Sequence, residues 1–226
     1  CHGDATGSIF VDVTGGGFAP YSYDWQTLNP ADTLQSLYNL VAGNYILTVT
    51  DAAGCDTTLS FDVATPGPLS VQASVINDVD CYGDSTGAVQ VVVIGGVPAY
   101  SYIWDDVAVS SSIVSNLAVG LHTVYITDDW NCTIEDTITI FENPLIVGNI
   151  SIVQNVSCHG GNDGIVSVSS TGGVLGHTFD WSNGHQGLSQ PDTNSGLFYG
   201  SYYVIIEDQL GCRVVDSVFI SEPDVL

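Results

Sequence analysis

Hydrophobic and polar residues alternate along many short segments of this chain, as they do in strands with one buried face. The clearest segments are residues 69–76, 121–127 and 133–141. Turns rich in glycine and proline separate them, and no segment has the period of an amphipathic helix. Short strands joined by turns at this spacing predict an all-β chain of tandem immunoglobulin-like β-sandwiches.

A set of short motifs occurs three times in the same order. Each copy begins with a loop in which Gly follows Cys at the second position, and these cysteines are 80 and 77 residues apart. The copies are Cys1, Cys81 and Cys158; Gly15-Gly16, Gly95-Gly96 and Gly172-Gly173; Trp25, Trp104 and Trp181; Leu40, Leu117 and Leu197; and Asp51 to Cys55, Asp128 to Cys132 and Asp208 to Cys212. Repetition at domain length is typical of an array, and it predicts three repeats at 1–66, 67–144 and 145–226.

The first repeat is predicted to lack its first strand. Strand-like segments at residues 69–76 and 145–153 come before the cysteine loops of the second and third repeats, whereas no such segment comes before Cys1 in this sequence. An open sheet edge is then expected in the first repeat, and open edges recruit further strands.

The tryptophans that follow the Gly-Gly turn are predicted to be core residues. Trp25, Trp104 and Trp181 occupy one register in all three repeats, which favours packing between two sheets over a platform for stacking sugars. Trp130 occurs once, in a loop, and is the best candidate for an exposed aromatic residue.

Two cysteines in each repeat predict disulfides, which can compensate for the thin core of a small domain. We predict one disulfide within each repeat: Cys1–Cys55, Cys81–Cys132 and Cys158–Cys212. The alternative joins consecutive repeats through Cys55–Cys81 and Cys132–Cys158. The number of intervening strands matters, because an odd number would place the two cysteines of a repeat at opposite ends of its sandwich. Four strands are clear between the two cysteines of the second repeat, and a fifth could lie within residues 105–116.

Charge limits the possible partners. The chain has 25 acidic residues and one basic residue, Arg213, for a net charge of -24. Nothing in it could neutralise phosphates, so nucleic acid is excluded as a partner, and an anionic membrane surface is disfavoured. No apolar run has the ~18 residues of a membrane span. The carboxylates either keep the protein soluble or bind cations.

Acidic residues beside the two cysteine-bearing loops are the candidate metal ligands. They are Asp4, Asp51, Asp84, Asp128, Asp163 and Asp208. If a disulfide joined the two loops of a repeat, these carboxylates would converge, and Ca²⁺ prefers such oxygen ligands. Calcium is therefore the candidate cofactor, although the spacing matches no EF-hand.

The sequence shows no catalytic motif. The sequence has no Ser/His/Asp set, no phosphate-binding loop and no Gly-x-Gly-x-x-Gly after a strand. His2 and His159 share a repeat position, but Tyr82 replaces them in the second repeat. We predict that the chain is not an enzyme.

The combination of Cys-x-Gly, Gly-Gly, aromatic-x-aromatic-x-Trp, Leu-x-x-Gly and Asp-x-x-x-Cys resembles the SprB-type repeats of very large surface adhesins of gliding bacteria, which the type IX secretion system exports. The resemblance implies an extracellular stalk or filament segment on the bacterial surface that presents a distal adhesive tip. It implies neighbouring repeats, lateral copies and a target at the tip as partners. It also implies O-glycosylation at Asp-Ser/Thr-apolar sites, here Thr33, Thr137 and Ser217.

Two other functions stay open. One is an array of Ca²⁺-dependent carbohydrate-binding modules, and the other is a set of accessory domains of a secreted hydrolase. The short, proline-bearing linkers at residues 65–68 and 142–144 favour the stalk, because they limit folding back and predict a length of ~100 Å for three repeats.

Overall fold

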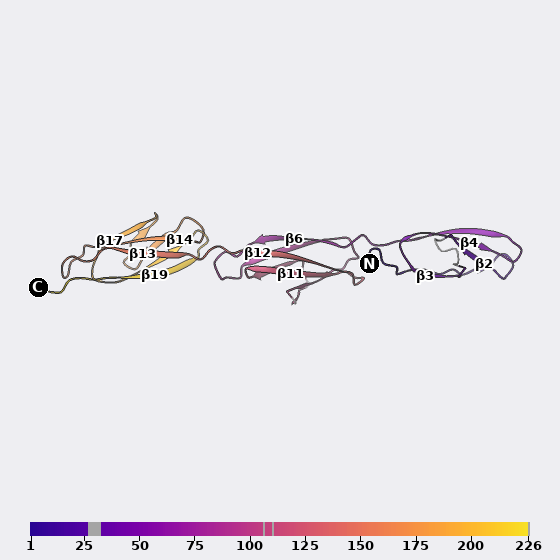
Figure 1. Cartoon of the computed structure of the whole chain (residues 1–226), viewed down its shortest axis with the longest axis horizontal. Helices are drawn as coiled ribbons and strands as arrows, with labels where there is room; N and C mark the ends of the chain where they lie inside the picture. Colours follow the sequence, from indigo (N-terminus) through magenta and orange to yellow (C-terminus); the bar gives the residue numbers. More distant parts are fainter. Residues whose placement is uncertain (27–32, 106, 110, 226) are drawn as a thin grey trace. The chain divides into compact units, whose positions relative to one another are not determined.

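The computed structural model describes residues 1–26, 33–105, 107–109 and 111–225, and in this part of the chain the regular elements are all β-strands (Figure 1). The first repeat has β1 (Gly7–Ile9), β2 (Ser22–Trp25), β3 (Leu37–Leu40), β4 (Gly43–Thr50) and β5 (Asp56–Val63). The second has β6 (Ser70–Asn77), β7 (Gly87–Ile94), β8 (Ser101–Trp104), β9 (Val107–Val109), β10 (Ile113–Leu117), β11 (Gly120–Thr127) and β12 (Thr133–Ile140). The third has β13 (Val147–Gln154), β14 (Gly164–Thr171), β15 (Thr178–Trp181), β16 (Gln186–Gly187), β17 (Asp192–Leu197), β18 (Gly200–Glu207) and β19 (Arg213–Ile220).

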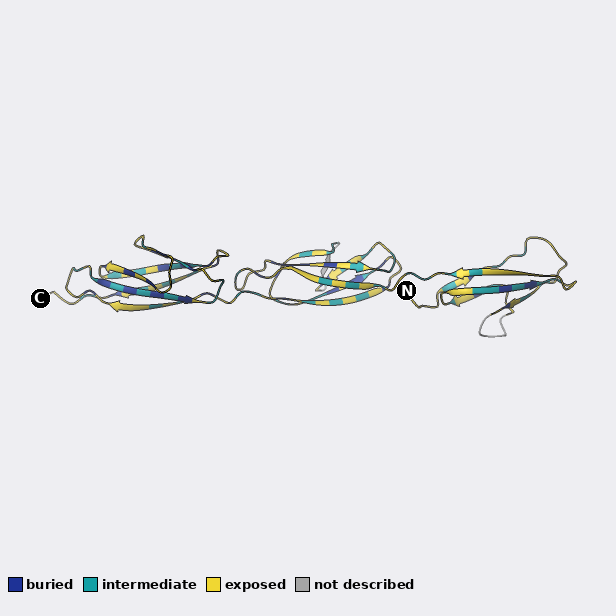
Figure 2. Cartoon of the chain, turned by 90° about the horizontal axis from the view of Figure 1, so that it is seen from above, coloured by how far each residue is buried: buried dark blue, intermediate teal, exposed yellow. Residues whose placement is uncertain are grey.

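The third repeat is a two-sheet sandwich. One sheet has the strand order β13-β14-β17 and the other has β16-β15-β18-β19, with antiparallel pairing. Its core combines side chains of both sheets, among them Val166 and Val168 on β14, Phe179 on β15 and Ile206 on β18. Burial alternates along the strands (Figure 2): β14 alternates buried with intermediate residues, and β19 alternates exposed with intermediate residues, as strands with one buried face do.

The other two repeats use the same strand orders. The second has β10-β7-β6 and β12-β11-β8-β9, and the first has β1-β3 and β2-β4-β5. In the described residues, however, each sheet of the first repeat has one strand fewer: β6 and β13 have no counterpart in one sheet, and β9 and β16 have none in the other. The predicted class, all-β and immunoglobulin-like, is confirmed.

The three repeat tryptophans lie in the cores, where the sequence placed them. Trp25 and Trp104 are 2% exposed and Trp181 is 4% exposed. The indole N–H of Trp25 donates to Leu34 O at 2.8 Å, and that of Trp181 donates to Asp192 Oδ2 at 2.8 Å. Buried aromatic rings of this size contribute much of the apolar area of a small core.

A glycine that ends each cysteine loop allows two strands to approach closely. A Cβ on Gly7, Gly87 or Gly164 would lie 2.8–2.9 Å from the carbonyl oxygen of the leucine in the Leu-x-x-Gly turn. The register of the strand pair shifts at the same point in all three repeats. Only a residue without a side chain fits there, which explains why these two motifs recur together.

Contacts group the chain into two compact units, and each takes part of the second repeat. One comprises Cys1–Gln72, Val92–Ser110 and Val124–Asp136, and the other comprises Ala73–Val91, Ser111–Thr123 and Thr137–Leu226. The predicted repeat boundaries stay a prediction. Each disulfide described below lies within one of these units.

Candidate functional site

The disulfides join consecutive repeats. Cys1 bonds to Cys132 and Cys81 bonds to Cys212, with Cα–Cα distances of 5.4 and 5.5 Å and a sequence separation of 131 residues in both. The predicted pairs Cys1–Cys55, Cys81–Cys132 and Cys158–Cys212 are therefore wrong, and so is the alternative set Cys55–Cys81 and Cys132–Cys158. In both disulfides, the first cysteine of one repeat bonds to the second cysteine of the next.

Strand number explains this pairing. Five described strands, β7 to β11, separate Cys81 from Cys132, because the segment after β8 does contain the additional strand β9. Five strands, β14 to β18, likewise separate Cys158 from Cys212. Each strand reverses the chain, so an odd number places the two cysteines of a repeat at opposite ends of its sandwich.

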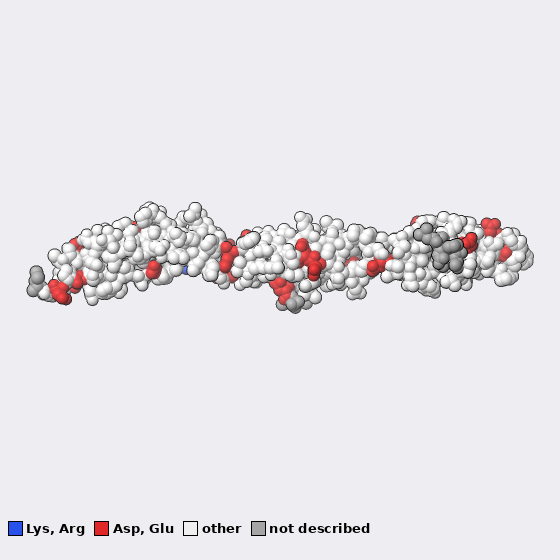
Figure 3. Space-filling view, viewed as in Figure 1, with Lys and Arg blue, Asp and Glu red and all other residues white. Residues whose placement is uncertain are grey.

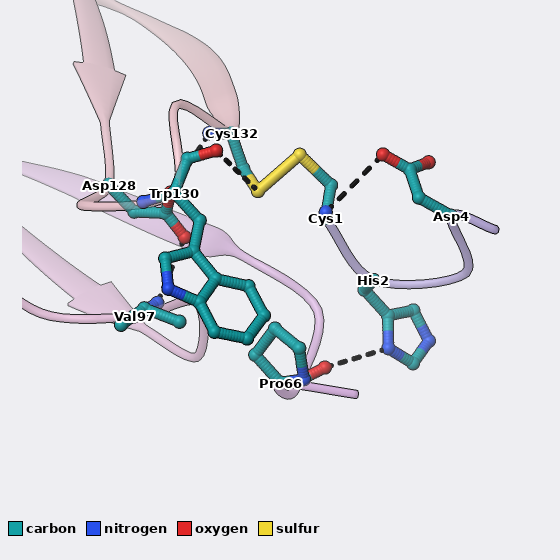
Figure 4. Close-up of polar contacts among 8 residues, drawn as sticks. All are labelled: Cys1, His2, Asp4, Pro66, Val97, Asp128, Trp130 and Cys132. Atoms are coloured by element: carbon teal, nitrogen blue, oxygen red, sulfur yellow. Dashed lines mark hydrogen bonds and ion pairs between the residues drawn. A yellow bond between two sulfur atoms is a disulfide. The ribbon is translucent and has the colours of Figure 1, made fainter. Parts of the chain in front are cut away.

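The first cysteine of each repeat lies on a loop that is attached to the outgoing linker, the segment that follows the last strand of that repeat. In the second repeat, Gly83 N donates to Glu142 Oε2 at 2.8 Å and Asn143 Nδ2 donates to Asp80 O at 2.9 Å. In the first repeat, the ring nitrogen Nδ1 of His2 lies 3.0 Å from Pro66 O (Figure 4). These contacts hold the first cysteine at the end where the chain leaves the repeat.

The second cysteine lies on a loop organised by one aspartate. Asp128 Oδ1 accepts hydrogen bonds from the backbone N–H groups of Trp130 and Cys132, each at 2.9 Å. Its other oxygen, Oδ2, accepts from Val97 N at 2.9 Å, just after the Gly-Gly turn (Figure 4). One carboxylate thus folds the Asp-x-x-x-Cys loop and fastens it to the turn.

The same three hydrogen bonds recur in the other repeats. Asp208 accepts from Leu210 N and Cys212 N through Oδ1 and from Val174 N through Oδ2, at 2.9–3.0 Å. Asp51 accepts from Ala53 N, Cys55 N and Phe18 N, at 2.8–3.0 Å. The equivalent glycine pair in the first repeat is therefore Gly16-Gly17, one residue later than the pair Gly15-Gly16 predicted from the repeated motifs.

The Gly-Gly turn lies beside the incoming linker, the segment that precedes the first strand of a repeat. Gly96 N donates to Gly67 O at 2.9 Å, and Gly173 N donates to Pro144 O at 2.8 Å. Gly95 and Gly172 have φ values of 77° and 79°, and a Cβ on either would collide with a linker carbonyl oxygen. Glycine is required here by conformation and by space. The second cysteine is thereby held at the end where the chain arrives, next to the first cysteine of the preceding repeat.

The three loop aspartates have a lowered pKa. Burial disfavours the charged form of Asp208 and of Asp128, but the backbone N–H groups that donate to each carboxylate outweigh burial and hold the pKa below its usual value. For Asp51 the N–H of Cys55 is the largest cause of the lower pKa. These carboxylates are anionic at neutral pH and act as acceptors for backbone donors.

The six candidate calcium ligands do not converge. Among the described residues, no group of three or more His, Cys, Asp or Glu side chains could hold a metal ion. Asp163 accepts from Ser157 and Gln154, Asp4 lies 3.3 Å from the amino group of Cys1, and Asp84 lines an open cleft of about 320 Å³ beside Cys81–Cys212. The structural role of Asp51, Asp128 and Asp208 was missed from sequence. Calcium binding stays a prediction.

The remaining candidates are exposed surface residues. The hydroxyl residues Thr33, Thr137 and Ser217 are exposed, and Asp32, which precedes the first of them, lies outside the described residues. Trp130 is 54% exposed and lines a small cavity with Pro66 and Cys1. O-glycosylation at the three hydroxyls therefore stays a prediction.

The histidines mostly support local structure. His159 Nδ1 lies 3.1 Å from Glu222 Oε1 on the outgoing side of the third repeat. His177 is buried, with Nδ1 2.6 Å from Ser170 Oγ. It replaces Tyr21 and Tyr100, whose hydroxyls donate to carbonyl oxygens of the Gly-Gly turns at 2.7 and 2.6 Å. The turn of the third repeat therefore uses different contacts.

Acidic residues are dispersed over the surface. On the face drawn in Figure 3 they form small separate groups. The one basic residue, Arg213, pairs with Glu207 at 2.8 Å. No helix in the described part of the chain is long and apolar enough to cross a membrane.

Peptide mapping without reduction should recover two linked pairs, Cys1 with Cys132 and Cys81 with Cys212. We expect iodoacetamide to label Cys55 and Cys158 before any reduction, because both thiols are free and exposed. Digestion at acidic residues followed by mass spectrometry would measure this, with the reduced chain, labelled at six cysteines, as the control. A linked Cys1–Cys55 peptide would contradict the pairing.

Comparison with solved structures gives immunoglobulin-domain proteins of low sequence identity. Eight immunoglobulin domains of the Down Syndrome Cell Adhesion Molecule are 13% identical with a TM-score of 0.41, covering 96% of this chain and 34% of that one. Three domains of the bacteriophage RB49 Highly Immunogenic Outer Capsid protein are 13% identical with a TM-score of 0.43, covering 93% and 90%. Titin domains I67-I69 are 14% identical with a TM-score of 0.42, covering 92% and 90%. The chain thus spans about a third of the first of these proteins.

Sequence comparison is more specific. No curated protein matches the chain. The model of the family described as SprB repeat matches it at residues 1–30, 73–109 and 150–186. Each match covers the cysteine loop, the Gly-Gly turn and the core tryptophan of one repeat. Each of the three repeats of this chain thus contains a region that is similar to a SprB repeat.

Proposed function

We propose that this chain is a segment of the stalk of a large bacterial cell-surface adhesin. In this proposal the repeats space and present a distal adhesive tip outside the cell, and they perform no catalysis. Their partners are the neighbouring repeats of the same protein, lateral copies in a filament, and the target that the tip binds.

The observation that carries the proposal is the pairing of cysteines across consecutive repeats. Each disulfide joins the outgoing end of one repeat to the incoming end of the next. A protein whose repeats acted separately would gain little from such links, whereas a load-bearing stalk gains a second covalent connection at every junction. Disulfides also persist in the oxidising conditions outside the cell.

The acidic surface agrees with this role. A net charge of -24 keeps exposed apolar side chains of neighbouring molecules apart, which favours solubility of a repetitive protein. The same charge excludes nucleic acid as a target, because phosphates would be repelled. The proposal also includes gliding motility and type IX secretion, and the only support for these two is the resemblance to SprB repeats.

Small-angle X-ray scattering of the oxidised chain tests the stalk. We expect a maximum dimension on the order of 100 Å for three sandwiches placed end to end. A compact globule of 226 residues would have a maximum dimension of about 50–60 Å, and this result would contradict the proposal. The variant Cys55→Ser/Cys158→Ser is the suitable sample, because it cannot form covalent multimers through free thiols.

The alternative function is an array of Ca²⁺-dependent carbohydrate-binding modules. Its supporting observation is Trp130, an exposed aromatic residue on a loop of the second repeat. A glycan-array signal that requires Ca²⁺ and disappears in Trp130→Ala would favour this function over the stalk.

A further inference from the structure

We propose that Cys55 and Cys158 are complementary covalent docking points for further repeats of the same kind. Cys158 would bond to the Asp-x-x-x-Cys cysteine of a repeat that follows, and Cys55 would bond to the first cysteine of a repeat that precedes. This inference goes beyond the proposed stalk function. A compact maximum dimension in small-angle scattering would reject the stalk, but it would not contradict the pairing proposed for Cys55 and Cys158.

The register of the two observed disulfides identifies the partner. Cys1 and Cys81, the first cysteines of their repeats, bond to Cys132 and Cys212, the second cysteines of the following repeats, across the same 131 residues. Of the three first cysteines, Cys158 is the one left unpaired, and of the three second cysteines the one left is Cys55. Cys158 is therefore a first cysteine without a second cysteine to bond to, and Cys55 is a second cysteine without a first cysteine to bond to.

The outgoing end of the third repeat already has the geometry of a paired junction. Gly160 N donates to Glu222 Oε2 at 2.8 Å, as Gly83 N donates to Glu142 Oε2 at 2.8 Å beside the paired Cys81. Gly161 N also closes the loop on Cys158 O at 2.9 Å, and Asp84 N does the same on Cys81 O at 3.1 Å. The loop that carries Cys158 is thus held on its outgoing linker although Cys158 forms no disulfide.

The incoming end of the first repeat is built in the same way. Asp51 accepts from Ala53 N, Cys55 N and Phe18 N, which is the arrangement that Asp128 and Asp208 make beside the paired Cys132 and Cys212. The loop N–H of Asp51 also donates to Cys55 O at 2.9 Å, as Asp128 N does to Cys132 O at 3.0 Å. The loop does not depend on a disulfide for its shape.

Exposure separates the paired second cysteines from the free one. Cys132 and Cys212 are 6% and 9% exposed, and each is bonded to a cysteine on the loop of the preceding repeat. Cys55 and Cys158 are both exposed. Each free thiol therefore stands open on a loop of fixed shape, where a preceding or following repeat would cover it.

The ligand of each docking point is the thiol of an SprB repeat, either in the same polypeptide or in a second copy of this chain. For a second copy the complementary pair is Cys158 of one molecule with Cys55 of another, a head-to-tail contact that leaves both outer ends open. Charge does not select this pair, because both ends are acidic, so specificity must come from the shape of the two loops.

Bond formation is a balanced thiol–disulfide exchange. With oxidised glutathione as the oxidant, the Cys158 thiolate attacks one glutathione sulfur and releases one reduced glutathione. The Cys55 thiolate of the second molecule then attacks the mixed disulfide at the Cys158 sulfur and releases the second. Two thiols are oxidised, and one glutathione disulfide is reduced to two thiols.

Two single variants test the pairing in solution. Cys55→Ser keeps Cys158, and Cys158→Ser keeps Cys55, so each alone can form only a symmetric dimer, whereas their mixture can form the Cys158–Cys55 dimer. In a glutathione redox buffer we expect the mixture to dimerise about tenfold faster than either variant alone, a preference that needs only about 1.4 kcal/mol of docking free energy. Non-reducing gels would give the rates and peptide mapping the linkage.

The controls decide between the outcomes. The double variant should stay monomeric, and mapping should find Cys1–Cys132 and Cys81–Cys212 intact throughout. Symmetric dimers that form as fast as the mixed one, absence of dimers, or a Cys55–Cys158 bond within one molecule of the unaltered chain would each overturn the proposal. Mapping Cys158 in protein isolated from cells would then identify whether its partner belongs to the same polypeptide or to another.

Discussion

Replacing Cys81 and Cys212 together by serine should lower the free energy of unfolding by about 5 kcal/mol. The disulfide closes a loop across 131 residues, and a loop of this size removes much of the conformational freedom of the unfolded chain. The urea midpoint, followed by the fluorescence of the buried tryptophans Trp104 and Trp181, would measure the loss.

The matched control is Cys55→Ser/Cys158→Ser, which also removes two thiols but breaks no disulfide. We expect its urea midpoint to equal that of the unaltered chain, because both residues are exposed and unpaired. If the two double variants unfolded at the same midpoint, the pairing of Cys81 with Cys212 would contribute nothing to stability.

Replacing Asp208 by alanine should cost about 3 kcal/mol of stability, because three backbone N–H groups lose their acceptor. Asp208 is 5% exposed, so water cannot readily replace the carboxylate. Asp224→Asn, which removes an equal charge from an exposed position, is the control and should unfold as the unaltered chain does. Equal midpoints for the two variants would contradict the role assigned to Asp208.

The same contacts predict an acid limit to stability. The pKa of Asp208 is lowered in the folded protein, so its contribution is fully present above the ordinary aspartate pKa of about 4 and is lost as pH falls through the folded pKa. Asp51 and Asp128 act in the same direction. We expect the urea concentration at the unfolding midpoint to decrease as the pH is lowered below about 4. In Asp208→Ala this decrease should be less steep.

Much of the fold could be predicted from the sequence. Alternating hydrophobicity located strands such as β11 and β12, and the register shared by Trp25, Trp104 and Trp181 identified core positions. Both follow from local rules, since a strand alternates its faces and a large ring at a repeated position is buried in each copy. The additional strand β9 was left open, because residues 105–116 have no clear alternation.

The disulfide pairing could not be predicted, and that undecided strand is the reason. With four strands between Cys81 and Cys132 the two cysteines would share one end of the sandwich, and with five they lie at opposite ends. The role of Asp128 was missed for a related reason. Its partner Val97 follows a turn 31 residues away, and sequence spacing does not reveal which distant turn a loop will meet.

The two disulfides also change what a single cut in the backbone can do. The closed loop from Cys1 to Cys132 and the closed loop from Cys81 to Cys212 overlap between residues 81 and 132. Every peptide bond from Cys1 to Cys212 therefore lies inside at least one closed loop. A protease that cuts once anywhere in this span leaves both pieces tethered, so severing the protein there requires a second cut or a reductant.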